Sequence, residues 1–442
     1  MTSEHTPDRP ARPRIVIVGA GFAGFEVARG LLKRVGDRAD VVLINPNNYF
    51  LYLPLLPEVT AGVLDPRRIA VSLTKALPGV RLVLGTVDSI DVGSRTLHYT
   101  DAERQGSEIT YDRLVLAAGS VNKLLPIPGV STVAHGFRGL AEALYLRDHI
   151  IRQFTLADKA TDPAERAARL TFAVVGAGYT GTEVAAQGPL ISRTLLKQYP
   201  RLREHPVRWL LLDVAPRVLP ELDQRLSRTA DRVLRRRGLE VLMGTSVQEA
   251  TKAGIRLTDG SFVPTRTLIW CVGVRPDPLV SEVNLKTERG RLVVNKDLTI
   301  PGRPEIFACG DVAAVPDVTR PGEVTAMTAQ HAHRQGKLAA RNVAASLDDG
   351  ELRDYKHHDL GFVVDLGGVS AAADPLGIPL AGLPAKAVTR GYHLLAMPGN
   401  RFRVAADWAL DAVLPRETAA LSLVRAGAVP LDTIAPDLPR TP

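Results

Sequence analysis

The chain has 442 residues, of which 45% are hydrophobic and 23% are charged, a balance typical of a globular protein with a sizeable core and about three domains. No apolar stretch approaches the roughly 18–20 residues of a membrane-spanning helix, and the polar start of the chain lacks the apolar core of a signal peptide, so we expect a cytoplasmic chain with a disordered lead-in over residues 1–13. The formal net charge is +8, but no recognition motif accompanies the basic residues, and we expect no nucleic-acid partner.

The first predicted unit is a strand over 14–18, a glycine corner and a helix over 23–35. The corner places Gly19, Gly21 and Gly24 in the pattern G-x-G-x-x-G. The first glycine permits a tight turn, the second lets a pyrophosphate approach the backbone, and the third lets helix and strand pack closely. Since the helix N-terminus also favours negative charge, this unit predicts a dinucleotide site.

A second strand over 40–44 ends at Asn45, where such units often carry an acidic residue that binds a ribose. A neutral amide still forms a hydrogen bond, but it contributes only about 0.5–1.5 kcal/mol net, against about 1.5–3 kcal/mol for a charged group. A large cofactor with many further contacts tolerates this loss. Asn45 therefore favours FAD over NAD at the first corner.

The segment that follows is expected to begin with loops and a short helix over 46–77, and then a small antiparallel sheet with strands at 81–84, 87–90 and 96–99. A buried strand over 114–120 that ends on small residues follows, and a domain crossing is expected at 126–130.

The glycine signature occurs a second time, again between a strand and a helix. The strand is expected over 171–175 and the helix over 179–197, with Gly176, Gly178 and Gly181 at the corner. Two dinucleotides bound by one chain indicate electron transfer between them.

The strand after the second corner, expected over 207–213, ends at Asp213. A carboxylate there can accept both ribose hydroxyls of NAD, and it would repel a 2′-phosphate. Arg217 leaves the use of NADPH open, but the acidic strand end favours NADH.

The remaining elements alternate strands and helices. They are a helix near 221–237, strands at 239–243, 254–257, 267–272 and within 291–308, a helix at about 325–345, two amphipathic helices between 384 and 414, and a loose Pro-rich tail from Val429. Gly310 and Asp311 form a sharp corner after the strand that ends near residue 308, and an Asp on such a corner can reach the ribityl or pyrophosphate part of a flavin.

Five segments together carry a family resemblance. Ala308–Asp311 resembles the C-terminal FAD motif of flavoproteins with two dinucleotide-binding domains. Within these, the chain resembles the type II (non-proton-pumping) NADH:quinone dehydrogenases over roughly residues 14–425. The segments that carry this likeness are Asn47–Phe50 with Pro54–Val59, Gly178–Glu183, Trp270–Pro276 and Thr328–Gly336.

The resemblance implies an α/β fold with two Rossmann-like doubly wound nucleotide-binding domains, one for FAD and one for NADH, and a C-terminal extension with amphipathic helices. The implied boundaries are 13–125 for the first part of the FAD domain, 126–290 for the NADH domain, 291–345 for the second part of the FAD domain, and 346–442 for a membrane or dimer region with a loose tail.

The resemblance also implies the site residues. Glu183 would act in proton delivery or substrate placement, Gln330 would hold the flavin edge or a quinone carbonyl, and Lys386 and His333 would assist, although His333 can equally be a helix-surface residue. The cofactor-binding residues that it implies, for FAD and NADH together, are Gly19, Gly21, Phe22, Ala23, Gly24, Asn45, Pro54, Leu55, Val87, Ala118, Gly119, Gly310, Asp311, Ala329, Gln330, Gly176, Gly178, Tyr179, Thr180, Gly181, Glu183, Asp213 and Gly273. No metal site is expected.

The implied partners are a quinone, the inner surface of the cell membrane and a second copy of the chain. The first C-terminal helix places Val388, Tyr392 and Leu395 on one face, and the second places Phe402 and Val413 on one face. Such amphipathic helices either pack on their own core or lie at an interface. The stretch from 382 to 406 has no acidic residue, which favours an interfacial anchor or a dimer contact. The family often has several tryptophans in this region, and this chain has only Trp408.

The two cysteines, Cys271 and Cys309, are expected to be buried packing residues. They are too few for a disulfide framework, and their separation argues against the flavin disulfide reductases and the sulfide:quinone reductases. Two alternative functions stay open: a soluble FAD-dependent NAD(P)H reductase of a ferredoxin-like protein, and a non-catalytic NAD(H)-sensing flavoprotein.

Overall fold

The computed structural model describes residues 12–357 and 360–431, so most of the expected lead-in and of the Pro-rich tail lies outside the described residues. The chain forms two compact units. The first unit consists of residues 1–50, 72–120 and 276–357, and the second of residues 51–71, 121–275 and 358–442. Each unit is therefore assembled from separate stretches of the chain.

The first unit is built on an eight-stranded sheet in the order β21-β22-β8-β1-β2-β5-β6-β7. Neighbours from β22 to β5 run parallel, and β6 and β7 extend the sheet antiparallel. The central strands are near-continuous apolar runs, as expected for parallel strands that are buried on both faces. The strands are β1 (Arg14–Val18), β2 (Asp40–Asn45), β5 (Arg81–Asp91), β6 (Thr96–Asp101), β7 (Gly106–Thr110), β8 (Arg113–Leu116), β21 (Thr299–Ile300) and β22 (Arg303–Ala308).

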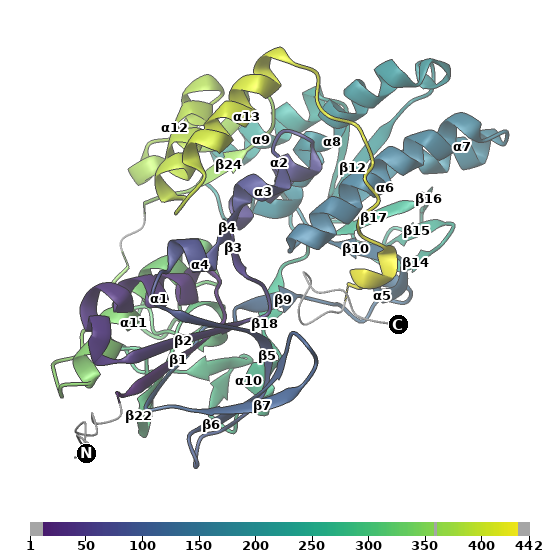
Figure 1. The fold of residues 1–442 in the computed structure, drawn as a ribbon. Helices are drawn as coiled ribbons and strands as arrows, with labels where there is room; N and C mark the ends of the chain where they lie inside the picture. Colours follow the sequence, from purple (N-terminus) through teal and green to yellow (C-terminus); the bar gives the residue numbers. More distant parts are fainter. Residues whose placement is uncertain (1–11, 358–359, 432–442) are drawn as a thin grey trace, which may run out of the picture. The chain divides into compact units, whose positions relative to one another are not determined.

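Two long helices, α1 (Phe22–Val35) and α11 (Ala329–Ser346), lie side by side next to this sheet (Figure 1). Glycines allow the close approach, because a Cβ at Gly336 would lie 2.3 Å from the carbonyl oxygen of Ala23, and one at Gly30 would lie 2.5 Å from the Ala340 methyl group. The remaining elements of this unit are η1 (Gly36–Arg38), α4 (Leu73–Ala76), α10 (Leu279–Glu282), η4 (Gly310–Val312) and the small sheet of β19 (Thr287–Glu288), β20 (Arg291–Val293) and β23 (Ala313–Ala314).

The second unit contains a five-stranded parallel sheet in the order β10-β17-β11-β12-β13 and a three-stranded antiparallel sheet. The strands are β10 (Ala134–Gly136), β11 (Thr171–Val175), β12 (Arg208–Asp213), β13 (Leu239–Met243), β17 (Thr267–Trp270), and β14 (Val247–Thr251), β15 (Gly254–Leu257) and β16 (Phe262–Pro264). The accompanying helices are α5 (Val130–Val133), α6 (Leu140–Lys159), α7 (Pro163–Arg169), α8 (Tyr179–Gln198), η3 (Pro200–Leu202) and α9 (Gln224–Arg236).

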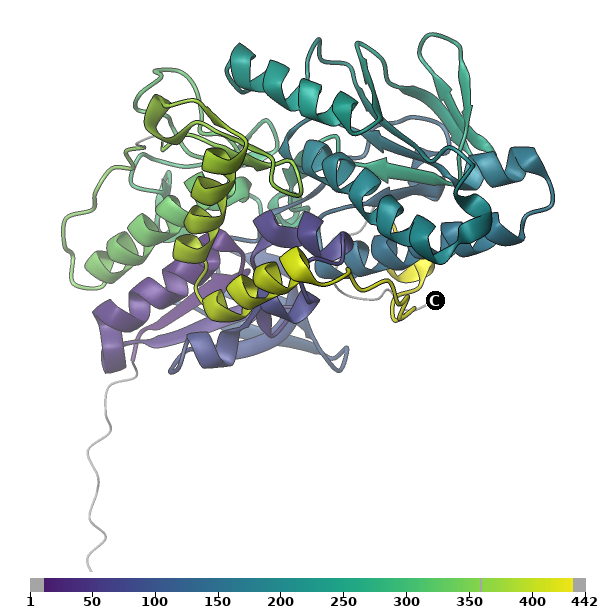
Figure 2. The ribbon, with the colours of Figure 1, turned by 90° about the horizontal axis from the view of Figure 1, so that it is seen from above.

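The second unit also holds a short segment from early in the chain and the C-terminal region. The early segment forms η2 (Leu53–Leu55), α2 (Leu56–Thr60) and α3 (Pro66–Ile69). The C-terminal region forms β24 (Val363–Asp365), β25 (Ala371–Ala373), η5 (Pro375–Gly377), β26 (Leu380–Ala381), α12 (Leu383–Ala396), α13 (Arg401–Val413) and η6 (Ala426–Ala428). Figure 2 shows that α13 follows α12 at an angle.

Residues 414–431 complete the second unit. The segment passes α6, where Arg147 donates to the Glu417 carbonyl and Asp148 accepts from the backbone N–H of Ser422. It ends with Leu431, which is 1% exposed and belongs to the hydrophobic core around Leu268 and Trp270.

Four of the five crossings between the units fall in short strands, β3 (Tyr49–Leu51), β4 (Ala70–Ser72), β9 (Ser120–Asn122) and β18 (Val274–Pro276), and the fifth follows residue 357. No helix among residues 12–357 and 360–431 combines the length and the apolar composition that a membrane crossing needs.

The predicted α/β fold is confirmed, and the strands at 14–18, 171–175, 239–243 and 254–257 match the structure. Two expectations were wrong. The strands at 81–84 and 87–90 are one strand, β5, with a register shift after Val87, because β5 pairs with β2 at its start and with β6 beyond. The buried strand over 114–120 ends at Leu116, and the chain re-enters a strand only at Ser120.

Candidate active site

The first glycine corner, in the first unit, is shaped for a ligand's phosphates. Gly19 has φ +92°, and a Cβ on it would lie 2.5 Å from the Ala117 carbonyl oxygen. A Cβ on Gly24 would lie 1.8 Å from the Gly19 carbonyl oxygen. At Gly21, in contrast, the Cβ position faces open space, with no atom from beyond its chain neighbours within 4 Å. The corner is thus closed where helix and strand meet and open where a pyrophosphate would approach.

Other predicted flavin residues lie at the same edge of this sheet, where the parallel strands end. Asn45 ends β2, Ala118 and Gly119 follow β8, and Gly310 and Asp311 follow β22. Asn45 accepts from the Ala20 backbone N–H (2.8 Å), and the Ser120 hydroxyl donates to Asp311. A ligand that enters at the glycine corner therefore finds polar groups from three further strand ends. These residues fit a flavin dinucleotide.

The remaining predicted flavin residues are spread over both units. Phe22 and Ala23 open α1, Ala329 and Gln330 open α11, and Val87 lies on β5, three residues past the last pair with β2. Pro54 and Leu55 lie in η2 of the second unit.

His333 lies on α11 and contacts α1. Its Nδ1 is 3.2 Å from Glu26 Oε1, and Glu26 also accepts from Arg29 at 2.6 Å. Burial alone would raise the pKa of Glu26, but His333 and Arg29 lower it overall. The structure thus gives His333 a helix-to-helix contact within the first unit.

The second glycine corner repeats the first. Gly176 has φ +104°, a Cβ on Gly181 would lie 1.8 Å from the Gly176 carbonyl oxygen, and Gly178 is open. Asp213 ends β12 and accepts from the backbone N–H groups of Ala177 (2.5 Å) and Ala215 (2.8 Å). The two corners thus share one hydrogen bond. In each, the backbone N–H of the residue after the first glycine donates to the side chain that ends the next strand, Asn45 in the first corner and Asp213 in the second.

The other residues predicted around the second corner are placed as follows. Tyr179 and Thr180 open α8, and the Tyr179 ring stacks on Phe362 with ring centroids 5.5 Å apart. Gly273 follows β17 with φ +100°. Arg217 donates to the carbonyl oxygens of Leu222 (2.8 Å) and Pro220 (2.6 Å), so its guanidinium is engaged by the backbone.

A cluster of acids around one lysine, of which Glu58 and Lys386 are buried and the others partly buried, lies in the second unit. We call Glu58, Glu183, Asp365 and Lys386 the acid–lysine cluster. Lys386 Nζ forms an ion pair with Asp365 and lies 3.8 Å from Glu58 Oε1. The backbone N–H of Asp365 donates to Glu183 Oε1 at 2.9 Å. Four elements, α2, α8, β24 and α12, therefore bring these groups together.

The electrostatics of this cluster favour the neutral forms of Glu58 and Glu183. Burial raises the pKa of Glu183 well above its usual range, and the charges of Asp365 and Glu58 add to the rise. Burial likewise raises the pKa of Glu58 to about 7, with Asp365 adding to the rise and Lys386 opposing it. A carboxyl group with a pKa near 7, such as that of Glu58, can give and take protons near neutral pH.

Two further side chains border the cluster. Trp408 Nε1 donates to Glu58 Oε2 at 2.5 Å, and the Arg390 guanidinium lies 4.8 Å from the centre of the Trp408 ring. His393 and Tyr52 form a buried hydrogen bond of 3.1 Å, and burial lowers the pKa of His393 to about 4.

Sequence reasoning named Glu183 and Lys386 as site residues but missed Glu58, Asp365 and Trp408 as their partners. A signal existed for Glu58, because it is a lone acid beside the apolar, Pro-containing run of residues 49–57, and an ionisable group in such surroundings is costly unless it is used. For Asp365 no local pattern marks the role, since only the packing of β24 against α12 brings it to Lys386.

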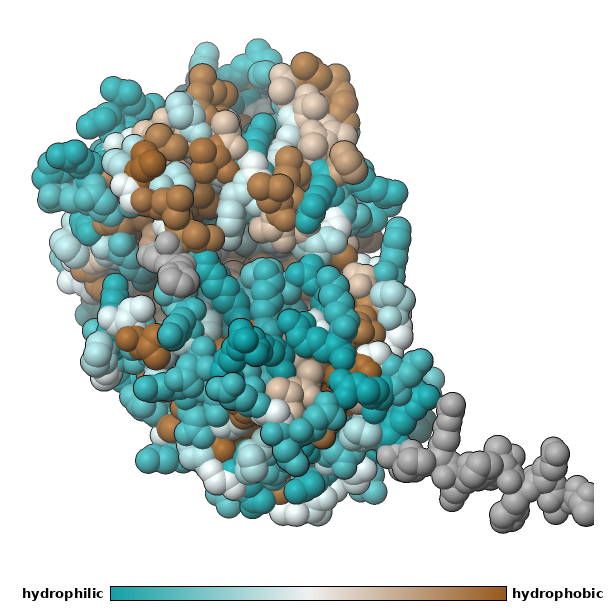
Figure 3. Space-filling view, turned by 90° about the vertical axis from the view of Figure 1, so that its left-hand side faces the viewer, coloured by the Kyte–Doolittle hydropathy of each residue, from teal (hydrophilic) through white to brown (hydrophobic). Residues whose placement is uncertain are grey.

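Both C-terminal helices expose a set of large hydrophobic side chains. On α12 the buried side chains include Lys386, Thr389 and His393. The exposed large hydrophobic residues of this region are Leu383, Tyr392, Leu395, Phe402, Leu410, Val413 and Leu414. Figure 3 shows hydrophobic side chains gathered in its upper part, on the side where Figure 1 shows α12 and α13. A helix that only covers its own core would not expose so many large apolar side chains.

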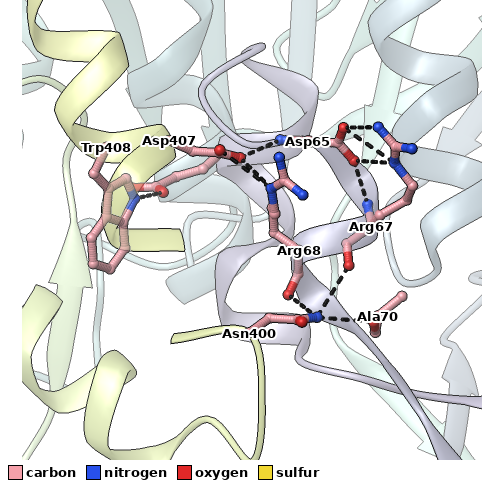
Figure 4. Close-up of polar contacts among 8 residues, drawn as sticks. Asp65, Arg67, Arg68, Ala70, Asn400, Asp407 and Trp408 are labelled. Atoms are coloured by element: carbon pink, nitrogen blue, oxygen red, sulfur yellow. Dashed lines mark hydrogen bonds and ion pairs between the residues drawn. The ribbon is translucent and has the colours of Figure 1, made fainter. Parts of the chain in front are cut away.

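Polar contacts fasten α13 to α3 and its surroundings (Figure 4). Asp407 pairs with Arg68 (3.0 Å) and accepts from the Asp65 backbone N–H (3.1 Å). The Asn400 side chain donates to backbone carbonyl groups of the 67–70 segment, the shortest bond being 3.1 Å to Arg68.

The two cysteines lie in packed surroundings. Cys309 is fully buried and Cys271 partly so, and burial raises the pKa of both thiols to about 12. Reactive cysteines need a lowered pKa, so both match the expected packing role. Within residues 12–357 and 360–431, no group of three or more His, Cys, Asp or Glu side chains could hold a metal ion.

Comparison with known proteins agrees with this geometry. The model of the pyridine nucleotide-disulphide oxidoreductase family matches residues 13–336. The chain is 33% identical over 413 residues to the type II NADH:quinone oxidoreductase NdhA of Mycobacterium tuberculosis, covering 90% of this chain and 86% of the relative. It is 30% identical to the type II NADH:quinone oxidoreductase of Staphylococcus haemolyticus, over 83% of this chain and 90% of that relative.

A solved structure of NDH2 from Plasmodium falciparum in complex with NADH matches with a TM-score of 0.84 at 18% identity, over 92% of this chain and 100% of that chain, which supports the fold. The curated relatives establish more than the fold, since they span nearly the whole chain above 30% identity. The chain belongs to the type II NADH:quinone oxidoreductases and is an enzyme of that class.

Proposed function

We propose that the chain oxidises NADH, uses FAD as its electron carrier and reduces a membrane quinone without pumping protons. The balanced reaction is quinone + NADH + H⁺ → quinol + NAD⁺. When bound, FAD supplies a ring that accepts two electrons from NADH and gives them to the quinone. The observation that carries the proposal is the pair of matching glycine corners, one in each unit.

FAD would be held in the first unit. Its pyrophosphate would lie at Gly21, where the backbone is open, with the α1 N-terminus favouring its charge. Asp311 would bind the ribityl chain. Gln330, in the first turn of α11, would hold the flavin edge or a quinone carbonyl.

NADH would be held at the second corner. The negative charge of Asp213 at the strand end disfavours the 2′-phosphate of NADPH. Arg217, the cation that could have offset this repulsion, is bound to two carbonyl oxygens. Both observations support NADH over NADPH.

Glu183 would supply a proton to the quinone oxygen. It follows Gly181 in the first turns of α8, and burial raises its pKa well above the usual range, which favours the protonated form that can donate. Lys386, which pairs with Asp365, would hold the charge balance of the site. His333 would steady the N-terminal half of α11 through Glu26.

The outward apolar face of α12 and α13 would dock on the cytoplasmic surface of the membrane. Phe402 is 92% exposed and Leu395 is 77% exposed, and the neighbouring Arg401 and Arg403 suit anionic lipid headgroups. The chain would be a peripheral protein, and the same region would support a homodimer.

The first experiment is steady-state NADH oxidation by the FAD-loaded protein with a short-chain menaquinone analogue, with a ferredoxin, and with oxygen alone. We expect fast turnover only with the quinone. Glu183→Gln should lower that turnover by about 10²-fold or more. The exposed Glu249→Gln variant is the matched control and should behave as wild type. Reduction of the flavin by NADH without quinone turnover would refute the proposal.

A further inference from the structure

We propose that Thr325 and Gln335 are positioning residues for the flavin, because one buried series of hydrogen bonds through them holds the Gly310–Asp311 corner at a fixed distance from the loop that leads into α11. The inference rests on the proposed function, since it concerns how the first unit binds FAD. It adds two residues that act through the flavin contacts rather than on the flavin itself.

The Gly310 corner is held by a side chain from α11. Gly310 follows β22 and has φ +74°, a conformation that L side chains rarely adopt. Its backbone N–H donates to Gln335 Oε1 at 2.8 Å, and Gln335 is 1% exposed. Because this N–H can only donate, it decides which end of the Gln335 amide faces the corner. Gln335 thus fixes the peptide group that enters the corner, one residue before Asp311.

The other end of the Gln335 amide reaches the loop before α11. Gln335 Nε2 donates to Thr325 Oγ1 at 3.0 Å. The Thr325 N–H donates to the Val315 carbonyl at 2.9 Å, and the Thr325 carbonyl accepts from Arg291 Nη1 at 2.8 Å. Thr325 is 1% exposed. All of its polar groups are therefore bonded, and they hold the loop five residues before Gln330.

Arg291 adds a buried charge to this arrangement. It lies on β20 and is 7% exposed, and its Nε has no hydrogen-bond partner in the part of the chain that the structure describes. Burial lowers the pKa of Arg291, and the negative charges of Asp311 and then Glu288 oppose that change. The guanidinium that anchors Thr325 is therefore also attracted to Asp311, so charge as well as hydrogen bonding links the loop to the corner.

Packing alone would not require these polar groups. The corner is already tightly packed, since a Cβ on Gly310 would lie 3.1 Å from the Ala23 methyl group. A methionine at position 335 could fill a similar volume, whereas a buried amide is costly unless it is hydrogen-bonded. Its two bonds go to the segments that carry Asp311 and Gln330. The amide thus serves the spacing between these two flavin contacts.

A fixed spacing has two consequences for a bound flavin. A site that is ordered before the ligand arrives loses less entropy on binding, so it binds more tightly. Helix α11 has 18 residues, and its N-terminus favours negative charge such as that of a reduced flavin. Loosening the loop should therefore weaken FAD binding, and it should weaken the binding of reduced flavin more than that of oxidised flavin.

The test compares Thr325→Val with Thr325→Ser in the full-length protein. Valine keeps the shape of threonine but leaves Gln335 Nε2 without its acceptor, whereas serine keeps the hydroxyl. The dissociation constant of FAD is measured on the apoprotein by flavin fluorescence. Thr325→Val should raise it about tenfold, and Thr325→Ser should stay close to the wild type. Gln335→Met, which removes both bonds of the amide, should raise it further.

The midpoint potential of the bound flavin is a readout that a loss of stability alone would not move. We expect a more negative potential in Thr325→Val than in the wild type, and recovery of the wild-type value in Thr325→Ser. Gln153→Met is the matched control, because it changes a buried glutamine of the second unit that accepts from Arg169 at 3.1 Å. It should keep both the FAD affinity and the potential.

The outcomes separate this inference from the proposed function. A wild-type apoprotein that does not bind FAD refutes both. A wild type that binds FAD without quinone turnover refutes the proposed function, and the FAD affinities of the variants still decide the inference. Equal dissociation constants and potentials in the wild type and Thr325→Val refute the inference alone. Should Gln335→Met fail to fold, the two Thr325 variants decide, because each changes only a few atoms.

Discussion

Asp407 allows a quantitative test of how α13 is attached. Both oxygens of its carboxylate accept from Arg68 Nε, at 3.2 and 3.0 Å, and one also accepts from the Asp65 backbone N–H at 3.1 Å. Asp407→Ala removes all of these bonds. The side chains of Asp407 and Arg68 are 12% and 23% exposed, so water compensates only in part.

The size of the effect follows from these contacts. A charged hydrogen bond contributes about 1.5–3 kcal/mol net, and partial solvent screening lowers that figure. We therefore expect Asp407→Ala to reduce the free energy of local opening of α13 by about 2 kcal/mol. This corresponds to a roughly 30-fold increase in the equilibrium constant for opening.

Amide hydrogen exchange measured peptide by peptide is the appropriate assay, since it reports local opening rather than global unfolding. Amides of residues 401–413 should exchange about 30-fold faster in Asp407→Ala, while those of β11 and β12 should not change. Arg403→Ala, an exposed change on the same helix, is the control. Exchange of α13 within threefold of the wild type would show that the Asp407 contacts do not hold the helix.

Four further outcomes are expected. Gly181→Ala should abolish NADH binding in a titration, because its Cβ would overlap the Gly176 carbonyl, whereas Gly178→Ala should fold normally and only weaken NADH binding. Asp213→Asn should raise the NADPH-to-NADH ratio of kcat/KM on the order of tenfold by removing a like-charge repulsion. In the folded protein the pKa of His393 is about 4, below the unfolded value of about 6.5. Protonation of His393 therefore favours the unfolded state, and the stability falls as the pH falls from about 6.5 to 4. The melting temperature of His393→Asn should fall less steeply than that of the wild type across this pH range. Phe402→Glu should abolish sedimentation with anionic vesicles and leave the melting temperature unchanged, because Phe402 is 92% exposed.

Local patterns were sufficient to predict the geometry of the two glycine corners. Gly19, Gly24, Gly176 and Gly181 are required by contacts between a strand and the helix directly after it, so adjacent residues carry the whole signal. The same holds for the strands, whose apolar runs are short and continuous. The boundaries proposed for the nucleotide-binding domains stay predictions.

Long-range packing explains what the sequence did not reveal. Helix α6 escaped notice because polar residues such as Arg147, Asp148 and His149 occupy its buried side and interrupt the apolar period. The acid–lysine cluster joins Glu58 to Lys386 across more than three hundred residues, and no local pattern records such a pairing. For α12, the periodicity was visible, but which face would be covered depended on the sheet of β24, β25 and β26.

The burial of Leu431 has a consequence for synthesis. The core of the second unit contains Leu431 together with residues as early as Val130, and the first unit needs β22 beside β8 to complete its sheet. The first unit therefore cannot complete its sheet before residue 308 is synthesised, and the second cannot complete its core before residue 431. Until residue 431 has been synthesised the nascent chain carries apolar segments without their partners, so truncation just before residue 431 should favour aggregation.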